Sequence, residues 1–179
     1  MEITMVCPCL LGLEGLVKDE LVYMGAQNVQ PQNGRVLFQG GPEILARANL
    51  NSRYGERILI QMGSFEAKTF EELFQQVKAL PWELWIGKQD AFPVKGRSLD
   101  SQLRSVPDCQ AIIKKAVVER LKQKYQIPWF EETGASRQIQ FLIMKDQVSV
   151  MLDSSGIGLH KRGYRANATE APIKETLAA

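Results

Sequence analysis

Hydrophobic and polar positions change period along this chain, and the changes predict where its first helices and strands lie. Short apolar runs predict strands at residues 3–6, 28–30, 35–39 and 57–62. Between them, apolar residues at helical spacing, among them Leu13 and Leu16, predict a helix that Gly25 ends, and a second helix begins at Pro42. The order strand–helix–strand–strand–helix–strand is the ferredoxin-like pattern.

Two further helices are predicted in the rest of the chain. Thr69 and Glu72 stand at the spacing of a capping box, in which each side chain satisfies a backbone donor of the other. The apolar stripe that follows them predicts a helix that ends before Pro81. A longer helix is expected from Ser105 to about Tyr125, with its buried positions on one line.

Three strands accompany these helices. A strand is expected at residues 91–94, where Pro93 favours an edge or end position because proline cannot donate to a sheet. Polar and apolar residues alternate at residues 138–143 and again at 147–152. The Lys145-Asp146 pair lies between them, so the segment is expected to form a hairpin with one covered face.

Length and composition fit this arrangement. The chain has 179 residues, of which 45% are hydrophobic and 23% charged, which is typical of a globular protein. The two sets of elements predict an α+β fold in two parts, with the boundary within residues 63–68. No apolar run reaches the roughly 18 residues that span a bilayer, and the first residues lack the basic region of a signal peptide. We therefore expect a cytoplasmic protein without a membrane partner.

Cysteine and histidine usage argues against metal or catalytic chemistry. Cys7, Cys9 and Cys109 leave one thiol over in any disulfide scheme, and structural zinc requires four ligands at wider spacing. His160 is the single histidine and has no acidic residue close in sequence to orient it as a general base. The Gly156-Ile157-Gly158 turn lacks the third glycine and the helix of a dinucleotide-binding loop. No catalytic, metal-binding or cofactor-binding residue is expected.

Charge is distributed unevenly between the two halves. Residues 1–86 hold seven Lys/Arg against ten Asp/Glu, a net −3, whereas residues 87–179 hold fifteen against ten, a net +5. A polyanion would therefore dock on the second half. The candidate RNA-binding residues are the basic side chains of two clusters and the histidine between them: Lys95, Arg97, Arg104, Lys114, Lys115 and Lys122, then His160, Lys161, Arg162 and Arg165.

Two other interpretations of these residues stay open at this point. Lysines on a helix commonly form a solvated face, and the second cluster could contact a neighbouring domain instead of phosphate. No aromatic residues are interleaved with the basic ones, so base stacking is not predicted. Residues 171–177 look like the start of a helix, with Pro172 near its first turn. Because so short a helix is marginal alone, we expect the chain to continue into another domain.

Two segments resemble a known family. Phe92-Pro-Val-Lys-Gly-Arg, with Ser105-Val-Pro-Asp-Cys-Gln-Ala-Ile-Ile-Lys-Lys-Ala, resembles the THUMP domain of bacterial RNA methyltransferases. Leu159-His-Lys-Arg-Gly-Tyr-Arg, with Ala171-Pro-Ile-Lys-Glu-Thr-Leu-Ala-Ala, resembles the junction to their Rossmann-like catalytic domain. The family is that of THUMP-containing guanine methyltransferases acting on large-subunit ribosomal RNA.

The resemblance implies a division of labour along the chain. Residues 1–65 would be the ferredoxin-like domain, 66–165 the THUMP domain that holds RNA, and 166–179 the start of a methyltransferase domain. The whole enzyme would use S-adenosylmethionine to methylate the exocyclic amine of a guanine. The catalytic Asp/Asn-Pro-Pro-Tyr/Phe motif and the glycine-rich cofactor loop of such enzymes are absent from these residues. The 179 residues are therefore expected to bind RNA without catalysing the reaction.

Three alternatives remain. The chain could be a stand-alone RNA- or ribosome-binding adapter without catalytic activity. A THUMP domain could also serve a different catalytic partner, such as one for tRNA thiolation. A small independent enzyme on the ferredoxin-like fold is the third alternative, but fold alone does not give function.

Overall fold

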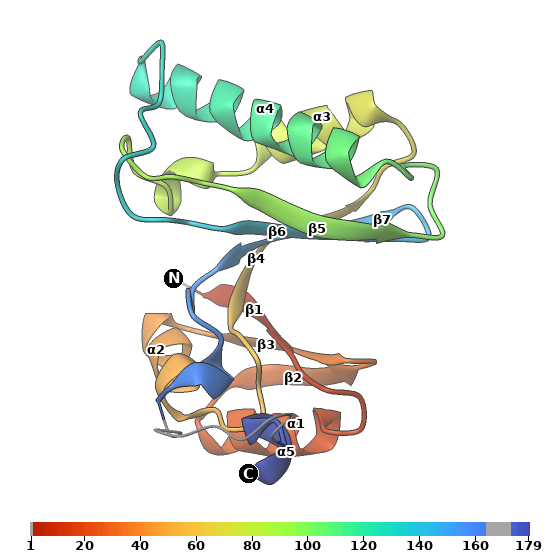
Figure 1. The fold of residues 1–179 in the computed structure, drawn as a ribbon, viewed down its shortest axis with the longest axis vertical. Coiled ribbons are helices and arrows are strands. Elements are labelled where there is room, and N and C mark those ends of the chain that lie inside the picture. The colour runs from red at the N-terminus through yellow and green to blue at the C-terminus, as the bar shows by residue number, and fades with distance from the viewer. Residues whose placement is uncertain (1, 164–172) are drawn as a thin grey trace. The chain divides into compact units, whose positions relative to one another are not determined.

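The computed structural model describes residues 2–163 and 173–179, which fold as two compact units. The first unit comprises residues 1–60 and 154–179, and the second comprises residues 61–153. The fold is mixed α/β, as the sequence predicted (Figure 1). In the described residues, no helix combines the length and the apolar character needed to cross a bilayer.

The first unit has the predicted ferredoxin-like order. Its elements are β1 (Ile3–Pro8), α1 (Glu14–Tyr23), β2 (Gln27–Gln32), β3 (Arg35–Gly40), α2 (Pro42–Asn51) and the first two residues of β4 (Leu59–Glu66), whose remaining residues belong to the second unit. The strands lie in the order β2-β3-β1-β4, and each pairs antiparallel with its neighbour. Val17 and Leu21 of α1 and Ile44 of α2 are buried. Leu16, one of the apolar residues whose spacing predicted this helix, is 47% exposed.

The second unit combines two helices with the remaining strands. It contains α3 (Phe70–Ala79), the short 3-10 helix η1 (Trp82–Leu84), β5 (Val94–Leu99), α4 (Val106–Tyr125), β6 (Ile139–Met144) and β7 (Gln147–Asp153). The strand order is β4-β7-β6-β5, with β5 parallel to β6 and β6 antiparallel to β7. Helices α3 and α4 lie on the same face of this sheet (Figure 1).

Local chemistry explains most of the second unit. The Thr69 hydroxyl accepts from the Glu72 amide at 3.2 Å and the Glu72 carboxylate accepts from Thr69, so the capping box is confirmed. The hairpin is confirmed too, and its two turn residues, Lys145 and Asp146, both have positive φ. The strand expected at 91–94 is wrong in its start: β5 begins only at Val94, and Ala91 makes a single isolated bridge.

Packing divides the chain differently from the sequence ranges. Strand β4 extends to Glu66 and so includes residues 63–66 of the expected boundary at residues 63–68. The segment that begins at Ser154 packs with the first unit and contains the 3-10 helix η2 (Leu159–Lys161) and α5 (Glu175–Ala178). The assignment of residues 166–179 to a further domain stays a prediction.

Candidate nucleic-acid interface

Strand β5 presents two of the predicted cations side by side. Lys95 and Arg97 are exposed and two positions apart, so both project from one face of the strand at about 6.6 Å spacing. The register pairs Arg97 with Leu142 and Ser98 with Ile143. Ile143 is fully buried on the sheet face that the helices cover, so Lys95 and Arg97 project from the opposite face.

Gly96 is the residue that lets β5 lie close to β6. A Cβ at this position would come within 2.3 Å of the Phe141 carbonyl oxygen and 2.5 Å of the Phe141 ring. Only glycine therefore fits between Lys95 and Arg97 without moving the strand. In this Lys-Gly-Arg sequence, glycine lets the backbone of β5 approach Phe141 on one face of the sheet, and the two cations project from the other face.

Two further cations stand where β5 ends. Arg104 is exposed in the segment before α4, and Lys145 donates its amide to the Leu99 carbonyl at 3.3 Å. Between these segments lies an open hollow of about 430 Å³, lined in part by Arg104 and Asp146. The Asp146 carboxylate accepts from the Gln102 amide at 2.8 Å and the Ser101 hydroxyl at 2.7 Å. These hydrogen bonds lower the Asp146 pKa, so the carboxylate is ionised. Its hydrogen bonds are made to residues of the fold.

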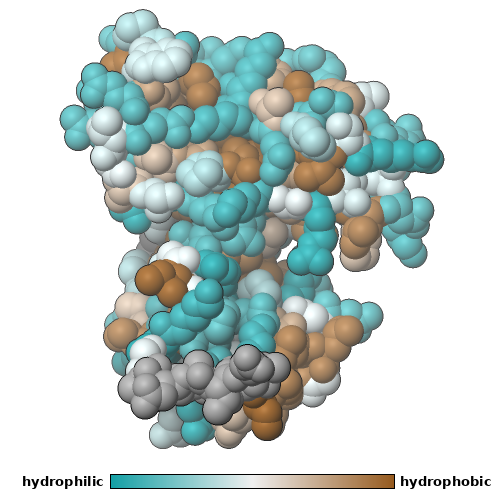
Figure 2. Space-filling model, viewed as in Figure 1, coloured by the Kyte–Doolittle hydropathy of each residue, from teal (hydrophilic) through white to brown (hydrophobic). Residues whose placement is uncertain are grey.

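We name these four residues, Lys95, Arg97, Arg104 and Lys145, the β5 strip. All four lie in the second unit, every residue of which is described, and none of them makes an ion pair there. Hydrophilic residues predominate over α4 and β5 in the view of Figure 2, with separate small apolar groups between them. The β5 strip is thus a set of exposed cations that make no ion pair within the second unit.

The predicted cations of α4 do not join this strip. Lys115 is exposed with its ammonium 5.6 Å from the centre of the Phe74 ring of α3, and Lys122 follows it one heptad later. Helix α4 covers the sheet face opposite to the one that carries Lys95 and Arg97. The structure therefore separates the lysines of α4 from the β5 strip.

Lys114 forms its contacts with other residues of the fold. Its ammonium donates to the Phe92 carbonyl at 3.1 Å and to Glu132 at 2.5 Å, and it lies 3.6 Å from the centre of the Phe92 ring. Arg120, also on α4, makes two hydrogen bonds to the Glu83 carboxylate, at 2.7 and 3.0 Å. These contacts lower the Glu83 pKa. These ion pairs attach α4 to neighbouring segments of the unit. Because each cation is balanced by a carboxylate, it attracts a phosphate less strongly.

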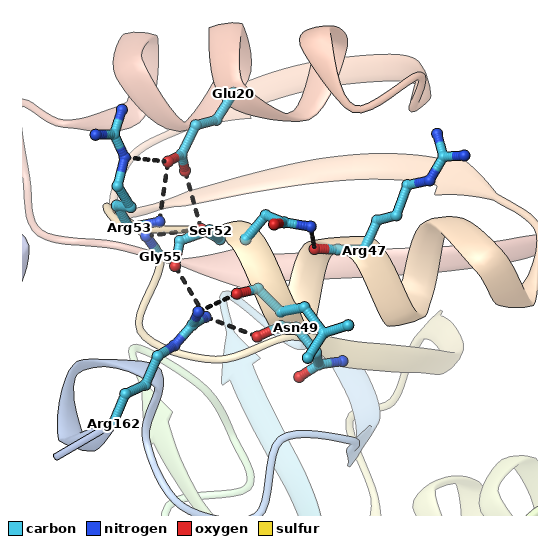
Figure 3. Close-up of polar contacts among 9 residues, drawn as sticks. Glu20, Arg47, Asn49, Ser52, Arg53, Gly55 and Arg162 are labelled. Carbon is cyan, nitrogen blue, oxygen red and sulfur yellow. Dashed lines mark hydrogen bonds and ion pairs between the residues drawn. The ribbon is translucent and has the colours of Figure 1, made fainter.

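Of the second predicted cluster, His160 and Lys161 lie on η2 in the first unit, and Arg162, which directly follows η2, makes hydrogen bonds within the fold. Its guanidinium donates to the carbonyls of Asn49 at 2.6 Å and Ser52 at 3.0 Å, and also to that of Leu50 (Figure 3). A fourth bond reaches the Leu159 carbonyl at 3.0 Å. The cation thereby caps the C-terminal carbonyls of α2, where the helix dipole is negative.

The other members of that cluster differ from Arg162. Lys161 is exposed, and His160 is half-buried with its Nδ1 lacking a partner among the described residues. Arg165 lies outside the described residues. Nearby, the Glu20 carboxylate accepts from the Ser52 hydroxyl at 3.0 Å and the Arg53 amide at 2.9 Å (Figure 3). This region is a network that holds α1, α2 and the returning chain together.

The described residues also bear on metals and nucleophiles. Among them, no three His, Cys, Asp or Glu side chains lie close enough to hold a metal ion. All three cysteines are buried and unpaired. Burial raises the pKa of Cys9 to about 11, with a smaller effect from nearby carboxylates, so this thiol is neutral at physiological pH.

Sequence reasoning missed two exposed residues that bear on binding. Lys145 was treated only as a turn residue, although a lysine in a hairpin turn is exposed by necessity. Trp129 is 75% exposed between α4 and β6, whereas the next residue, Phe130, is buried. Its signal in the sequence was an aromatic pair after Pro128, in a segment with no helix or strand periodicity.

Comparison with known protein families matches both units. A profile described as the RlmL ferredoxin-like domain matches residues 4–59, and a profile of the THUMP domain matches residues 67–153. THUMP domains bind RNA. Residues 60–66 lie between the two matches.

Curated relatives extend these matches. The chain is 47% identical over 178 residues to "Putative RNA methyltransferase YpsC" of Bacillus subtilis, which covers 98% of this chain and 46% of that protein. It is 32% identical over 173 residues to "Ribosomal RNA large subunit methyltransferase K/L" of Psychromonas ingrahamii, covering 96% of this chain and 23% of that protein. The chain thus spans less than half the length of these relatives.

Solved structures of similar proteins have the same fold as this chain. A "predicted N6-adenine-specific DNA methylase" from Listeria monocytogenes superposes with a TM-score of 0.95 at 46% identity, covering 99% of this chain and 47% of that one. "SMU.472, a putative methyltransferase complexed with SAH" superposes with a TM-score of 0.92 at 42% identity and the same coverage. The chain therefore contains an RlmL-type ferredoxin-like domain, at residues 4–59, followed by a THUMP domain, at residues 67–153.

Proposed function

We propose that this chain is the RNA-binding region of an S-adenosylmethionine-dependent methyltransferase that modifies the exocyclic amine of guanine in large-subunit ribosomal RNA. The relative from Psychromonas ingrahamii is named a large-subunit ribosomal RNA methyltransferase. The structural relative in complex with SAH supports S-adenosylmethionine as the methyl donor of the whole protein. The 179 residues bind and position RNA, and residues beyond them carry out the chemistry.

The β5 strip carries this proposal. Five basic residues of the second unit, Lys68, Lys78, Lys114, Arg120 and Arg137, make ion pairs with carboxylates of the same unit. The cations of the β5 strip make none. A phosphate backbone would supply the missing counter-charge, and each contact would release a condensed counterion from the nucleic acid.

The strip suits a backbone more than a base sequence. Lys95 and Arg97 follow one another along an exposed strand, and neither is set in a pocket of hydrogen-bonding partners that could select one base. Phosphate contacts of this kind fix position and orientation but carry no sequence information. Choice of the target nucleotide is therefore assigned to the remainder of the protein.

RNA binding can be tested on this chain directly. We expect salt-dependent binding to a structured ribosomal RNA fragment and weaker binding to a DNA duplex of the same sequence, both measured by fluorescence anisotropy. Lys95→Gln/Arg97→Gln should weaken RNA binding at least 10-fold, and Lys115→Gln/Lys122→Gln is the matched control on the opposite face. Equal loss in the two variants would overturn the proposed surface.

The substrate requires a separate experiment on the whole protein. Its gene is deleted in the source organism, and nucleosides of ribosomal RNA and genomic DNA are analysed by mass spectrometry. The proposal predicts loss of N2-methylguanosine from large-subunit RNA and its return when the gene is restored. Loss of N6-methyladenine from DNA with ribosomal RNA unchanged would contradict it.

A further inference from the structure

Trp129 is exposed on a segment that is otherwise firmly attached. The residues between α4 and β6 form no regular element, and the indole is 75% exposed there. A single exposed apolar residue is ordinary on a protein surface. What distinguishes Trp129 is that the contacts on both sides of it are extensive, so the ring is held outward.

The contacts that follow Trp129 hold the segment against α4 and against the residues that precede β5. Phe130 is buried and meets the Phe92 ring edge-on, with 5.6 Å between ring centres and 88° between planes. Glu132 pairs with Lys114 and accepts from the Phe92 amide at 3.4 Å. Further along, the Gly134 amide donates to the Gln89 carbonyl at 2.7 Å. The segment therefore has a defined path.

The contacts that precede Trp129 are equally specific. Gln126 ends α4 in the left-handed conformation, with φ of 53°, and its amide bonds to the Lys122 carbonyl at 2.9 Å. The Tyr125 hydroxyl donates to the Ile86 carbonyl at 2.5 Å. Trp129 thus follows an anchored helix end by only four residues.

Charge around this segment favours a nucleic acid. The Lys88 ammonium lies 5.8 Å from the Tyr125 ring centre, and Lys124 stands in the last turn of α4. Neither makes an ion pair within the second unit, which is described in full. Glu131 is exposed two residues after Trp129 and would repel a phosphate placed directly over the indole. The arrangement therefore fits a base on the ring with the backbone toward the lysines.

The segment of Trp129 belongs to the same unit as the β5 strip. Phe92, on which Phe130 packs, lies two residues before β5 begins, so the segment that carries Trp129 packs on the chain that leads into this strand. Proteins that hold single strands combine such cations with an aromatic face on which bases stack, whatever the base. Tryptophan offers the largest face for this purpose.

We propose that the Trp129 indole is a stacking platform for one unpaired base of the RNA that this chain binds. This inference rests on the proposed function, because it requires that the chain bind RNA. It adds a preference for RNA that contains unpaired nucleotides next to the bound backbone, which the cations alone would not give.

The test compares two RNAs on the full chain. One is a blunt duplex, and the other is the same duplex with a single-stranded extension of about six nucleotides. Trp129→Ala should weaken binding of the extended RNA by roughly 5- to 50-fold, in line with the loss of one base–aromatic stack. Trp129→Phe should lose less than about threefold. Leu84→Ala, at another exposed apolar residue, is the control and should change neither affinity.

Each outcome decides the inference. An effect of Trp129→Ala confined to the extended RNA supports stacking. Equal weakening for both RNAs, or unchanged affinity for both while the wild-type chain binds, overturns it and leaves the β5 strip standing. Absence of salt-dependent RNA binding by the wild-type chain is instead the failure of the proposed function. Thermal melting of Trp129→Ala, expected within about 2 °C of wild type, verifies that the variant is folded.

Discussion

Arg162 in the first unit and Lys95 with Arg97 in the second belong to equally basic stretches of sequence, yet the structure uses them differently. Arg162 donates four hydrogen bonds to backbone carbonyls. Lys95 and Arg97 project from a strand without a carboxylate partner in their unit. The comparison teaches that the intramolecular partners of a cation, more than its place in a basic run, decide whether it is available to a ligand.

The same contrast recurs within the second unit. Lys114 and Arg120 on α4 are paired with Glu132 and Glu83, so their charge is balanced inside the fold. Removing a cation of this kind should cost stability, whereas removing one of the β5 strip should cost affinity. Stability and affinity therefore separate the two groups experimentally.

The largest effect is expected at Gly96, because it touches the scaffold of the strip itself. Gly96→Val would place side-chain carbon within 2.3 Å of the Phe141 carbonyl, so β5 must shift from β6. Overpacking of this kind costs about 3 kcal/mol. Thermal melting should show the loss, and RNA affinity should fall with it. As a control, Ser98→Val on the same face should be tolerated better; an equally stable Gly96→Val would refute the role given to the glycine.

Arg162→Ala should lower the stability of the first unit by roughly 1–3 kcal/mol, since it leaves several carbonyls at the end of α2 without a donor. Urea unfolding measures this change. RNA affinity at a temperature where the variant is folded should stay within about twofold of wild type. Lys161→Ala, next to it and exposed, should leave stability unchanged. A large loss of affinity without a loss of stability in Arg162→Ala would reverse our assignment.

A smaller effect is expected at the Glu83–Arg120 pair, and it depends on pH. Because the folded pKa of Glu83 is lowered from its ordinary 4.5, the pair stabilises the protein above that pH and loses its contribution as pH falls through the folded value. At pH 7, Glu83→Gln should lower the melting temperature by about 2–4 °C, the shift that about 1 kcal/mol produces in a chain of this size.

That difference from wild type should shrink as the pH falls below 4.5 and through the lowered pKa of Glu83, because the wild-type carboxylate then becomes protonated. Melting curves from pH 3 to pH 7 measure it. A difference that stays constant over this range would show that the ion pair is not its source. The RNA affinity of Glu83→Gln at pH 7 should equal that of wild type, because the Glu83–Arg120 pair lies outside the β5 strip.

Much of the fold could be predicted because local rules dominated it. The capping box at Thr69, the helix start at Ser105 and the alternation that gives β6 and β7 are short-range patterns, and all three are confirmed. Leu16 could not be placed from spacing alone, because the width of the buried face depends on what packs against it. The return of the segment after Asp153 to the first unit depends on contacts about 100 residues apart, which no local pattern carries.

The candidate site was predictable in composition and not in geometry. Lys95 and Arg97 could be placed on one face of a strand from their spacing. Nothing in the sequence indicated that Lys114 pairs with Glu132, 18 residues away, or that the sheet separates Lys115 from Lys95. Trp129 was overlooked because exposure on a non-repetitive segment leaves no periodic trace.

The salt dependence of RNA binding tests the central claim most directly. Dissociation constants of wild type, Lys95→Gln/Arg97→Gln and Lys115→Gln/Lys122→Gln are measured for one RNA from 50 to 300 mM salt. If Lys95 and Arg97 each neutralise one phosphate, the slope of log K against log salt should fall by about 1.4 to 1.8 in the first variant. It should stay within about 0.5 of wild type in the second. Equal slopes in all three proteins would contradict the assignment of the β5 strip as the RNA-binding surface.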